Sequence, residues 1–530
     1  MISEVISEAL ETNLQVLSFN VEPKVLKSKN YNNKETRIQG VDKNLQEPLT
    51  SLKVPQKNHH DFDKVLKSLQ DLFQDWPLNG PIVSKTLKNH QDFDKRLERL
   101  QDFLLTEENI QVFEETRPSP DSEQNEPLDQ RIPRGSNFTQ RHPLENTELK
   151  NSFQVTLLSV TARVARHGYT VREYTVITDD GYVLGLQRIT SESVSQQDKE
   201  ELRKLPVLLM HGLLMSAASW LDEDPRTGLA YLLAQAGHDV WLGNARGSYY
   251  SRRHVTLDPD SDSAYWQFCA DEIGKYDLPA SIDKVLNETG AVELNYIGFS
   301  QGGGTFFMMC SELPHYCKKA NIMIALAPSG RHLSTKSPLF RKLSEFFENN
   351  EKALFDVGIY EVLPRNGLVQ QLFNFFCRRS EFALQLCELF KGYFDGYHPG
   401  SITKDSLLNM VANFPSGTSV HNMARYGQIV RSKTIHKFDY GSQKNTQLYG
   451  SSKPPVYNLS AVTVPVFVIY GRNDGIVDIR DIKWLIPNLP NVIEAFEVED
   501  PLWAHMDVAY SHYVPKLLYP KVNEYLMFNK

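Results

Sequence analysis

The sequence predicts an α/β fold with a mostly parallel central sheet that is covered by helices on both faces. From about residue 155 onward, short apolar runs alternate with helix-like stretches, which is typical of strands that are buried on both sides. Asp179-Asp-Gly181 separates the first two runs and predicts a hairpin between them. The runs expected to form strands cover residues 174–178, 182–189, 206–210, 238–242, 294–297, 322–326, 464–470 and 492–498.

Composition and charge limit the class of protein. A chain of 530 residues, 41% of them hydrophobic, is long enough for two or more domains and can bury a large core. The net charge of -8 gives no reason to expect binding to nucleic acid or to an anionic membrane. Five cysteines are too few for a disulfide framework, although Cys377 and Cys387 are close enough in sequence to bridge. No apolar run approaches the roughly 18 residues of a transmembrane segment, and the polar, acidic start does not resemble a signal peptide.

Residues 1–150 differ from the rest of the chain. They are polar and contain an internal repeat, in which the pattern of residues 58–73 returns at 89–104. Apolar side chains recur at helical spacing in both copies, so we expect two amphipathic helices, followed by a proline-rich linker over 116–150. One interpretation is docking to an unknown partner or to a lipid surface. The simpler interpretation, which we favour, is a poorly ordered extension whose two helices pair weakly with each other.

The functional interpretation rests on the motif Gly298-Phe299-Ser300-Gln301-Gly302. This Gly-x-Ser-x-Gly pattern occurs once in the chain, between a short buried strand and the apolar start of a helix. Strand, tight turn and helix is the context in which the pattern forms a nucleophile elbow. The serine then has a strained backbone that pushes its hydroxyl above the sheet, and the two glycines remove side chains that would collide. Ser300 is therefore the predicted nucleophile of an α/β-hydrolase fold.

A serine hydroxyl is a poor nucleophile until a base removes its proton, and that base needs a carboxylate to hold its tautomer. In α/β-hydrolases the acid follows the serine in the chain and lies after a late strand. Asp474 comes directly after the strand expected over 464–470, so it is the predicted acid. Asp478 and Asp481 are alternatives, and any of the three carboxylates can instead be a solvated turn residue or a helix cap.

The base should be a histidine in the loop after the last strand. His505, in Trp503-Ala-His-Met-Asp507, follows the strand expected over 492–498 at a suitable distance. His512 is an alternative, but it falls in a terminal helix that we expect over residues 511–528. We therefore predict His505 as the general base.

Two backbone N–H groups should stabilise the oxyanion that forms when the serine attacks. One normally belongs to the residue after the nucleophile, here Gln301. The other comes from the loop after an early strand, here His211-Gly-Leu-Leu-Met215, in which Leu213 is the predicted donor. Gly212 lets this backbone approach closely, and His211 is expected to orient the loop rather than to take part in the chemistry.

The alternation of strands and helices is interrupted from about residue 331 to 456. This stretch is helix-like and rich in aromatic residues, and it lies where an inserted cap would cover the carboxyl ends of the strands. We expect a two-part chain, with the polar extension over 1–150 and a hydrolase domain with its cap over 151–530. The sequence has no convincing zinc-ligand spacing, phosphate-binding loop or dinucleotide fingerprint, so we expect neither a metal nor a cofactor.

A series of further motifs occurs in order along residues 155–528. They are Glu173-Tyr-Thr-Val-Ile-Thr-Asp-Asp-Gly-Tyr-Val-Leu184, His211-Gly-Leu-Leu214, Asp239-Val-Trp-Leu-Gly-Asn-Ala-Arg-Gly-Ser-Tyr-Tyr-Ser-Arg-Arg-His254, Tyr276-Asp-Leu-Pro-Ala280, Pro415-Ser-Gly-Thr-Ser419, Phe438-Asp-Tyr-Gly441, Pro454-Pro-Val-Tyr457 and Asn473-Asp474. Any one of them would be weak, but together with the elbow they are highly specific. This part of the chain resembles the acid lipase family, which includes gastric lipases and lysosomal acid lipase.

The resemblance implies an α/β-hydrolase fold with a helical cap, and hydrolysis of neutral lipid esters, triacylglycerol or sterol ester, at a lipid–water interface. The cap cysteine pair of the family resembles Cys377 and Cys387, shifted slightly. The resemblance also suggests a secreted or lysosomal protein, although no signal peptide is recognisable at residue 1. The catalytic and oxyanion residues of the family match Ser300, Asp474, His505, Leu213 and Gln301.

The sequence departs from the family pattern at several places. The residue before the serine is usually His, and here it is Phe299, which implies a change in pH optimum or substrate fit without loss of a catalytic group. The histidine is followed by Met506-Asp507-Val508 where Leu-Asp-Phe is usual, and the loop before it is slightly longer. The extension over 1–150 has no counterpart. Glycosylation sequons occur at Asn137, Asn287 and Asn458, but a chain this rich in Asn, Ser and Thr would contain about that many by chance.

The sequence thus predicts a serine-dependent carboxylic ester hydrolase that acts on lipids. Two other classes of protein use the same scaffold. A catalytically inactive lipid- or partner-binding protein would normally have lost at least one catalytic residue, whereas here the set is complete. A serine peptidase would share the chemistry, but the apolar cap argues against a peptide substrate.

Overall fold

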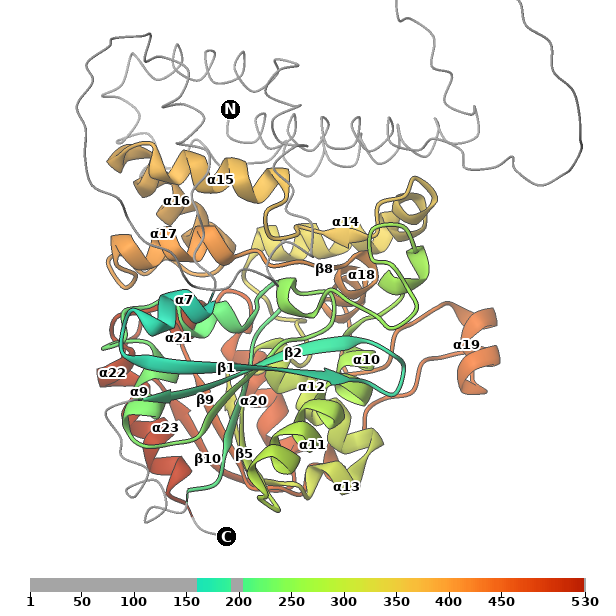
Figure 1. Cartoon of the computed structure of the whole chain (residues 1–530). Helices are drawn as coiled ribbons and strands as arrows, with labels where there is room; N and C mark the ends of the chain where they lie inside the picture. The colour runs from blue at the N-terminus through green and yellow to red at the C-terminus, as the bar shows by residue number, and fades with distance from the viewer. Residues whose placement is uncertain (1–159, 192–203, 529–530) are drawn as a thin grey trace, which may run out of the picture. The chain divides into compact units, whose positions relative to one another are not determined.

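The computed structural model describes residues 160–191 and 204–528 (Figure 1). The repeat predicted at 58–73 and 89–104 and the linker predicted over 116–150 lie outside the described residues. Within the described part, an eight-stranded sheet is flanked by helices, and a mainly helical insertion separates strands β6 and β9. Among these residues, none of the helices combines the length and the apolar character that a membrane span requires.

The main sheet confirms the predicted fold class. Its strands follow the order β1-β2-β4-β3-β5-β6-β9-β10, and only the β1–β2 and β2–β4 pairs are antiparallel. The predicted hairpin is present, because Ile177 pairs with Val183 across the Asp179-Asp-Gly181 turn. The strands are β1 Tyr169–Ile177, β2 Val183–Ser191, β3 Val207–Met210, β4 Val240–Gly243, β5 Leu294–Phe299, β6 Ala320–Leu326, β9 Val466–Tyr470 and β10 Val492–Glu497.

Burial along the strands follows from their sequences. Strands β3, β4, β5 and β9 are buried at every position, because they are largely apolar and lie between two layers of helices. The edge strands β1 and β10 keep several exposed positions, in keeping with the polar residues among them. The core of the domain is therefore centred on the middle of the sheet, directly beneath the strand ends that carry the predicted site.

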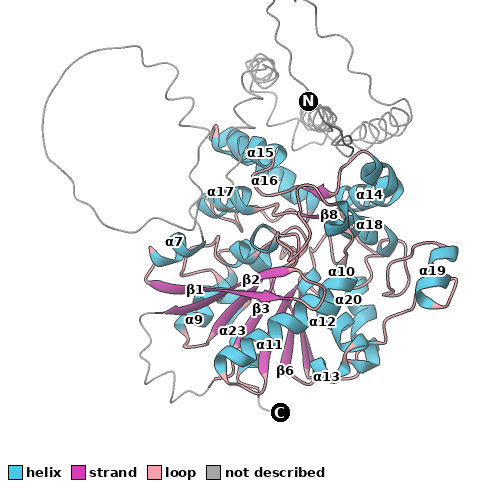
Figure 2. Ribbon diagram, turned by 45° about the vertical axis from the view of Figure 1, so that its right-hand side comes forward, coloured by secondary structure: helices cyan, strands magenta, loops and turns pink. Residues whose placement is uncertain are grey.

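Helices outside the insertion lie on both faces of the sheet (Figure 2). Helix α9 packs beside α22 and α23, and α11 packs against α12. Their bounds are α7 Val160–Ala165, α9 Leu229–Gln235, α10 Ala270–Glu272, α11 Leu278–Thr289, α12 Gln301–Glu312, α13 Pro314–Cys317, α20 Ile479–Leu485, α21 Asp507–Tyr510, α22 Val514–Leu517 and α23 Tyr519–Leu526.

The single terminal helix expected over 511–528 is wrong. Over these residues the chain forms the two short helices α22 and α23 instead, and His512 lies between α21 and α22. Pro515 and Pro520 each lie at the start of a helix. A proline is tolerated there, but inside a continuous helix it would remove a backbone hydrogen bond and clash with the preceding turn.

The insertion between β6 and β9 is mainly helical, as expected, and also contains a small antiparallel sheet of β7 and β8 that the sequence did not predict. Cys377 and Cys387 form a disulfide that joins α15 to α16. A second disulfide, which the sequence did not predict, joins Cys310 and Cys317. The elements are α14 Pro338–Asp356, β7 Glu361–Val362, α15 Leu368–Arg378, α16 Glu381–Phe394, α17 Lys404–Asn413, β8 Thr418–Ser419, α18 Val420–Ile429 and α19 Ser442–Tyr449.

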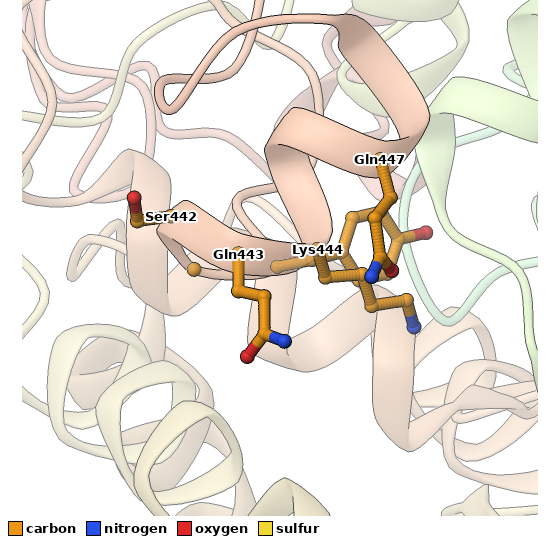
Figure 3. A pocket seen from close by; sticks show the side chains of 6 residues that line it. Ser442, Gln443, Lys444 and Gln447 are labelled. Carbon is orange, nitrogen blue, oxygen red and sulfur yellow. The ribbon is translucent and has the colours of Figure 1, made fainter.

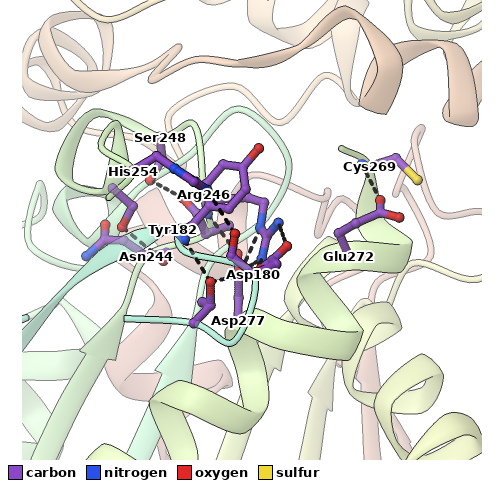
Figure 4. A network of polar contacts seen from close by, with 12 residues as sticks. Asp180, Tyr182, Asn244, Arg246, Ser248, His254, Cys269, Glu272 and Asp277 are labelled. Carbon is purple, nitrogen blue, oxygen red and sulfur yellow. Dashed lines mark hydrogen bonds and ion pairs between the residues drawn. The ribbon is translucent and has the colours of Figure 1, made fainter. Parts of the chain in front are cut away.

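A buried ionic network joins the β1–β2 turn to the loop after β4 (Figure 4). The Arg246 guanidinium donates to Asp277 Oδ1 at 2.7 Å and to Asp180 Oδ2 at 2.6 Å, and it lies 3.8 Å from the centroid of the Tyr182 ring. Burial raises the pKa of Asp277 to about 6, although the charge of Arg246 opposes that rise. Separating these partners would leave a buried charge unpaired, which is energetically costly. The network therefore fixes the path of the loop after β4, and this loop lies beside the predicted site.

Candidate active site

Ser300 occupies the strained turn that the motif predicts. It lies between β5 and α12 with φ 52° and ψ −117°, a conformation that non-glycine residues rarely adopt. A Cβ on Gly298 would lie 2.7 Å from the backbone of Gly302, and a Cβ on Gly302 would collide with the carbonyl oxygen of Met210. Both glycines are therefore required by the close approach of the elbow to the neighbouring backbone.

His505 and Asp474 come together although 30 residues separate them in the chain. The Nδ1 atom of His505 lies 2.7 Å from Asp474 Oδ2, and both side chains are buried. The other carboxylate oxygen, Asp474 Oδ1, accepts hydrogen bonds from the N–H groups of Ile476 and Val477 at 2.9 and 2.7 Å. The carboxylate is thus held in place by the backbone of its own turn. Its Oδ2 atom accepts a hydrogen bond from His505 and fixes the tautomer in which Nδ1 carries the proton and Nε2 is the acceptor.

The electrostatics of the pair favour a basic imidazole. Burial by itself would lower the pKa of His505, but the charge and hydrogen bond of Asp474, together with the charge of Asp395, raise that pKa above its ordinary value. A neighbouring carboxylate stabilises the imidazolium in this way in serine hydrolases.

The alternative residues from the sequence have other partners. Asp478 lies 2.8 Å from Lys336 Nζ and 2.7 Å from Arg480 Nε, and it caps α20. Asp481 accepts hydrogen bonds from Arg331 and from the backbone of Ser334. The ring of His512 contacts the carbonyl oxygen of Ser401 at 2.8 Å. Of the candidates, the structure brings only Asp474 and His505 together.

The loop after β3 lies beside the elbow. A Cβ on Gly212 would lie 3.1 Å from the Ser300 Cβ, so the absent side chain allows the loop to approach the serine. His211 supports the loop from below, since its Nδ1 lies 2.8 Å from Gly212 O and its Nε2 accepts a hydrogen bond from Ala245 N–H at 3.1 Å. Burial lowers the pKa of His211 to about 4, so the ring stays neutral and structural at ordinary pH.

Gln301, the other predicted oxyanion donor, is the first residue of α12. The first N–H groups of a helix have no partner within the helix, so the amide of Gln301 points toward the helix N-terminus without an intrahelical acceptor. Its side chain is anchored by the insertion: Gln301 Oε1 accepts hydrogen bonds from Asn422 Nδ2 at 2.9 Å and from the Tyr426 hydroxyl at 3.1 Å. Sequence reasoning missed both partners, because nothing near Gln301 in the chain indicates which face of α18 meets it.

Ser300 and His505 open into one small, mainly apolar cavity of about 30 Å³. The lining combines residues of the loop after β3, the elbow, the insertion and the two loops that carry Asp474 and His505, namely Gly212, Leu213, Leu214, Met215, Phe299, Ser300, His332, Phe340, Phe394, Phe414, Tyr426, Ile476, His505 and Met506.

A larger, open depression of about 410 Å³ lies along α19 (Figure 3). Its walls come from a single short segment, and none of the predicted catalytic or oxyanion residues takes part in it. The lining residues are Tyr440, Gly441, Ser442, Gln443, Lys444 and Gln447. We therefore place the candidate active site in the smaller cavity, where the reactive groups converge.

The fold and the arrangement of these side chains define the class of protein. A parallel sheet, a serine at a strained strand–helix turn and a buried histidine–aspartate pair are the features of an α/β-hydrolase. In agreement, the family model described as the alpha/beta hydrolase fold matches residues 206–510, and a partial alpha/beta-hydrolase lipase region matches residues 160–224.

Relatives narrow the class to one family. The chain is 38% identical over 385 residues to Lipase 1 of Drosophila melanogaster, which covers 72% of this chain and 83% of that protein. It is 36% identical to the gastric triacylglycerol lipase of Homo sapiens, over 68% of this chain and 89% of the lipase. It is 34% identical to the lysosomal acid lipase/cholesteryl ester hydrolase of Homo sapiens, over 69% of this chain and 90% of that protein. The chain belongs to the acid lipase family, a relationship that indicates a carboxylic ester hydrolase acting on lipid esters.

Proposed function

We propose that this chain hydrolyses neutral lipid esters, triacylglycerol or sterol ester, through an acyl-enzyme formed on Ser300. The observation that carries the proposal is the convergence of Ser300 and the Asp474-bound ring of His505 on one apolar cavity. The names of two relatives add support, since one is a gastric triacylglycerol lipase and another a lysosomal acid lipase/cholesteryl ester hydrolase.

The reaction proceeds in two halves. Ser300 Oγ attacks the acyl carbonyl while His505 Nε2 takes the hydroxyl proton, and Asp474 stabilises the imidazolium that forms. The bond between the acyl carbon and the alcohol oxygen then breaks, and His505 returns the proton to the departing alcohol. Water next attacks the acyl-enzyme with His505 again as the base, which releases the fatty acid and restores Ser300.

The N–H groups of Leu213 and Gln301 stabilise the oxyanion in both halves. Two features support this assignment: Gln301 lies at the N-terminus of α12, where partial positive charge favours an anion, and Gly212 brings the loop of Leu213 close to Ser300. Donors of this kind contribute about 10²–10³-fold each to kcat in serine hydrolases.

The apolar lining supports a lipid acyl chain as the substrate group. Phe340, Phe394 and Phe414 from the insertion line the cavity beside Ser300. Because these aromatic rings lie over Ser300, we expect the insertion or its side chains to move when a lipid substrate is met. Contact with a lipid–water interface would supply apolar surface for such a movement.

The direct test is hydrolysis of p-nitrophenyl butyrate, emulsified triolein and cholesteryl oleate from acid to neutral pH, with Ser300→Ala beside the wild type. Ser300→Ala should retain the wild-type melting temperature and lose about 10⁴-fold or more of kcat. Ser311→Ala, on the same helix α12, is the matched control and should keep full activity.

Turnover of triolein or cholesteryl oleate that depends on Ser300 would support the proposal and select the ester. Turnover of the butyrate ester alone would refute the long-chain substrate. A folded wild type without turnover would favour the inactive binding protein. An active Ser300→Ala would refute the assigned nucleophile. A peptide substrate assayed beside the esters would detect a peptidase, which would cleave the peptide faster.

A further inference from the structure

A third buried carboxylate, Asp395, lies beside the catalytic pair and plays no part in the steps above. It follows α16 directly, so it belongs to the insertion, and only 4% of its surface is exposed. Its Oδ1 accepts a hydrogen bond from His505 N–H at 2.9 Å, and its Oδ2 accepts one from Met506 N–H at 2.7 Å. Both carboxylate oxygens therefore accept hydrogen bonds from successive N–H groups of the loop that carries the predicted base.

The backbone around Asp395 is inserted between the acid turn and the histidine loop. A Cβ on Gly475 would collide with the carbonyl oxygen of Asp395, and a Cβ on Gly396 would collide with the carbonyl oxygen of Asn473. The same Cβ on Gly396 would lie 3.1 Å from the Cβ of Ala504. The two catalytic loops therefore meet across this segment of the insertion.

The residues after Asp395 make a second connection to the histidine loop. Asp507 Oδ2 accepts hydrogen bonds from His398 Nδ1 and from Ala504 N–H, both at 2.7 Å, and its Oδ1 accepts one from Ser401 Oγ at 2.7 Å. Residues 395–401 thus bind the histidine loop at His505, Met506 and Asp507. The position of the ring depends on a part of the chain that joins α16 to α17.

Charged groups surround Asp395 on each element that packs against it. Lys391 lies one turn earlier on α16, Asp474 belongs to the acid turn, and His505 belongs to the histidine loop. Burial raises the pKa of Asp395, and the charge of Asp474 raises it further, whereas Lys391, His505 and the N–H of Met506 act in the opposite direction. The charge of Asp395 in turn raises the pKa of His505.

We propose that Asp395 is a positioning residue, whose carboxylate holds the backbone of the histidine loop so that His505 meets both Asp474 and Ser300. The proposal rests on the function proposed above and deepens it, because it makes the insertion part of the catalytic geometry rather than only a cover for the cavity. Asp395 itself touches neither substrate nor the reacting atoms.

The variant that tests it is Asp395→Asn in the full chain. The amide keeps the size of the side chain but replaces one acceptor by a donor, so one of the two backbone hydrogen bonds is lost together with the charge. We expect kcat on p-nitrophenyl butyrate to fall by about 10²-fold, the loss typical of a small misplacement of a catalytic group. KM should stay within about twofold, as expected when only transition-state stabilisation is removed.

The pH profile supplies a readout that a merely structural role would not move. Since a carboxylate favours the protonated imidazole, its removal lowers the pKa of His505. Neutral His505 is the active form, so the acid limb of kcat/KM should move to lower pH in Asp395→Asn. The same shift should appear in the ¹H NMR titration of His505, identified by its absence in His505→Ala, which requires no turnover.

Asp271→Asn is the matched control. Asp271 is also a buried carboxylate that accepts a hydrogen bond from a backbone N–H, that of Phe438, and pairs with Arg425, but it does not contact the histidine loop. The Asp271→Asn variant should have a lower melting temperature than the wild type but the same acid limb in its pH profile of kcat/KM. If Asp395→Asn does not fold, Asp395→Ser, which is smaller and keeps one acceptor, takes its place in both measurements.

The outcomes separate the two proposals. A reduced kcat with a displaced acid limb in the Asp395 variant, and neither effect in Asp271→Asn, supports the positioning role. An unchanged acid limb and an unchanged NMR titration overturn it, even if Ser300→Ala is inactive and the proposed function stands. A wild type without turnover that depends on Ser300 refutes the proposed function, and the NMR titration alone then decides whether Asp395 acts on His505.

Discussion

The imidazole of His505 packs against the phenyl ring of Phe299, with the ring centroids 4.8 Å apart and the planes inclined by 36°. Phe299 immediately precedes Ser300 and is fully buried, and its ring also meets Trp220 edge to face at 6.2 Å. An apolar ring therefore lies where acid lipases usually have a histidine. It keeps water from one side of the predicted base, which strengthens the interaction of that base with Asp474.

Phe299→Ala should destabilise the fold by about 3–5 kcal/mol, the usual cost of emptying a buried phenylalanine site. It should also move the acid limb of the pH profile of kcat/KM to lower pH. The carboxylates of Asp474 and Asp395 raise the pKa of His505 above its ordinary value in spite of burial, and water admitted beside the ring would weaken that effect. Urea unfolding and a pH series on p-nitrophenyl butyrate measure the two changes. Phe299→Leu, which keeps the site apolar, should shift the limb less, and an equal shift in both variants would contradict the explanation.

Asp474→Asn should keep the fold and lower kcat by about 10⁴-fold, because the amide favours the wrong tautomer of the histidine. Ser300→Ala activity sets the lower limit of the assay. Asp478→Asn is the comparison, since Asp478 is equally buried but pairs with Lys336 and Arg480. An equal loss of kcat in Asp478→Asn would show that the wrong aspartate has been assigned.

His238→Gln should change how stability depends on pH. Burial lowers the pKa of His238 to about 4 in the folded chain, whereas an unfolded histidine titrates near about 6.5. Between these values the unfolded state binds the extra proton, so this group stabilises the fold less and less as pH falls from about 6.5 to about 4. The variant should therefore gain stability relative to the wild type over that range. The urea midpoints of both proteins at a series of pH values test this, and a constant difference would contradict it.

Gly302→Ala should prevent the elbow from closing. Its Cβ would collide with the carbonyl oxygen of Met210 in strand β3, which is backbone and cannot turn aside. Gly290→Ala provides the contrast, because its Cβ would meet no atom within 4 Å, although φ is 69°. This variant should lose only the about 1–2 kcal/mol of stability that a left-handed backbone costs a non-glycine residue. Thermal melting of the two variants compares the costs. A similar loss at both positions would argue against close approach as the reason for Gly302.

Local sequence patterns account for the parts of the fold that are built from neighbouring residues. Each expected strand is present, since a continuous apolar run between turns is sufficient to place a buried strand. The single helix predicted near the end of the chain is wrong, because Pro515 and Pro520 each lie at the start of a separate short helix. The small β7–β8 sheet was missed, since two-residue strands leave no detectable alternation.

The candidate site also has one part that local sequence predicts and another that depends on contacts between distant segments. Local sequence was enough to predict the elbow, because Gly298, Ser300 and Gly302 form it from local backbone requirements, and the strand pattern predicted that Asp474 and His505 follow β9 and β10. The groups that surround these residues come from distant parts of the chain. Asp395 reaches His505 across 110 positions and Asn422 reaches Gln301 across 121. Such hydrogen bonds depend on how the insertion folds back over the sheet, and a contact between distant segments leaves no periodicity or motif in either segment from which it could be predicted.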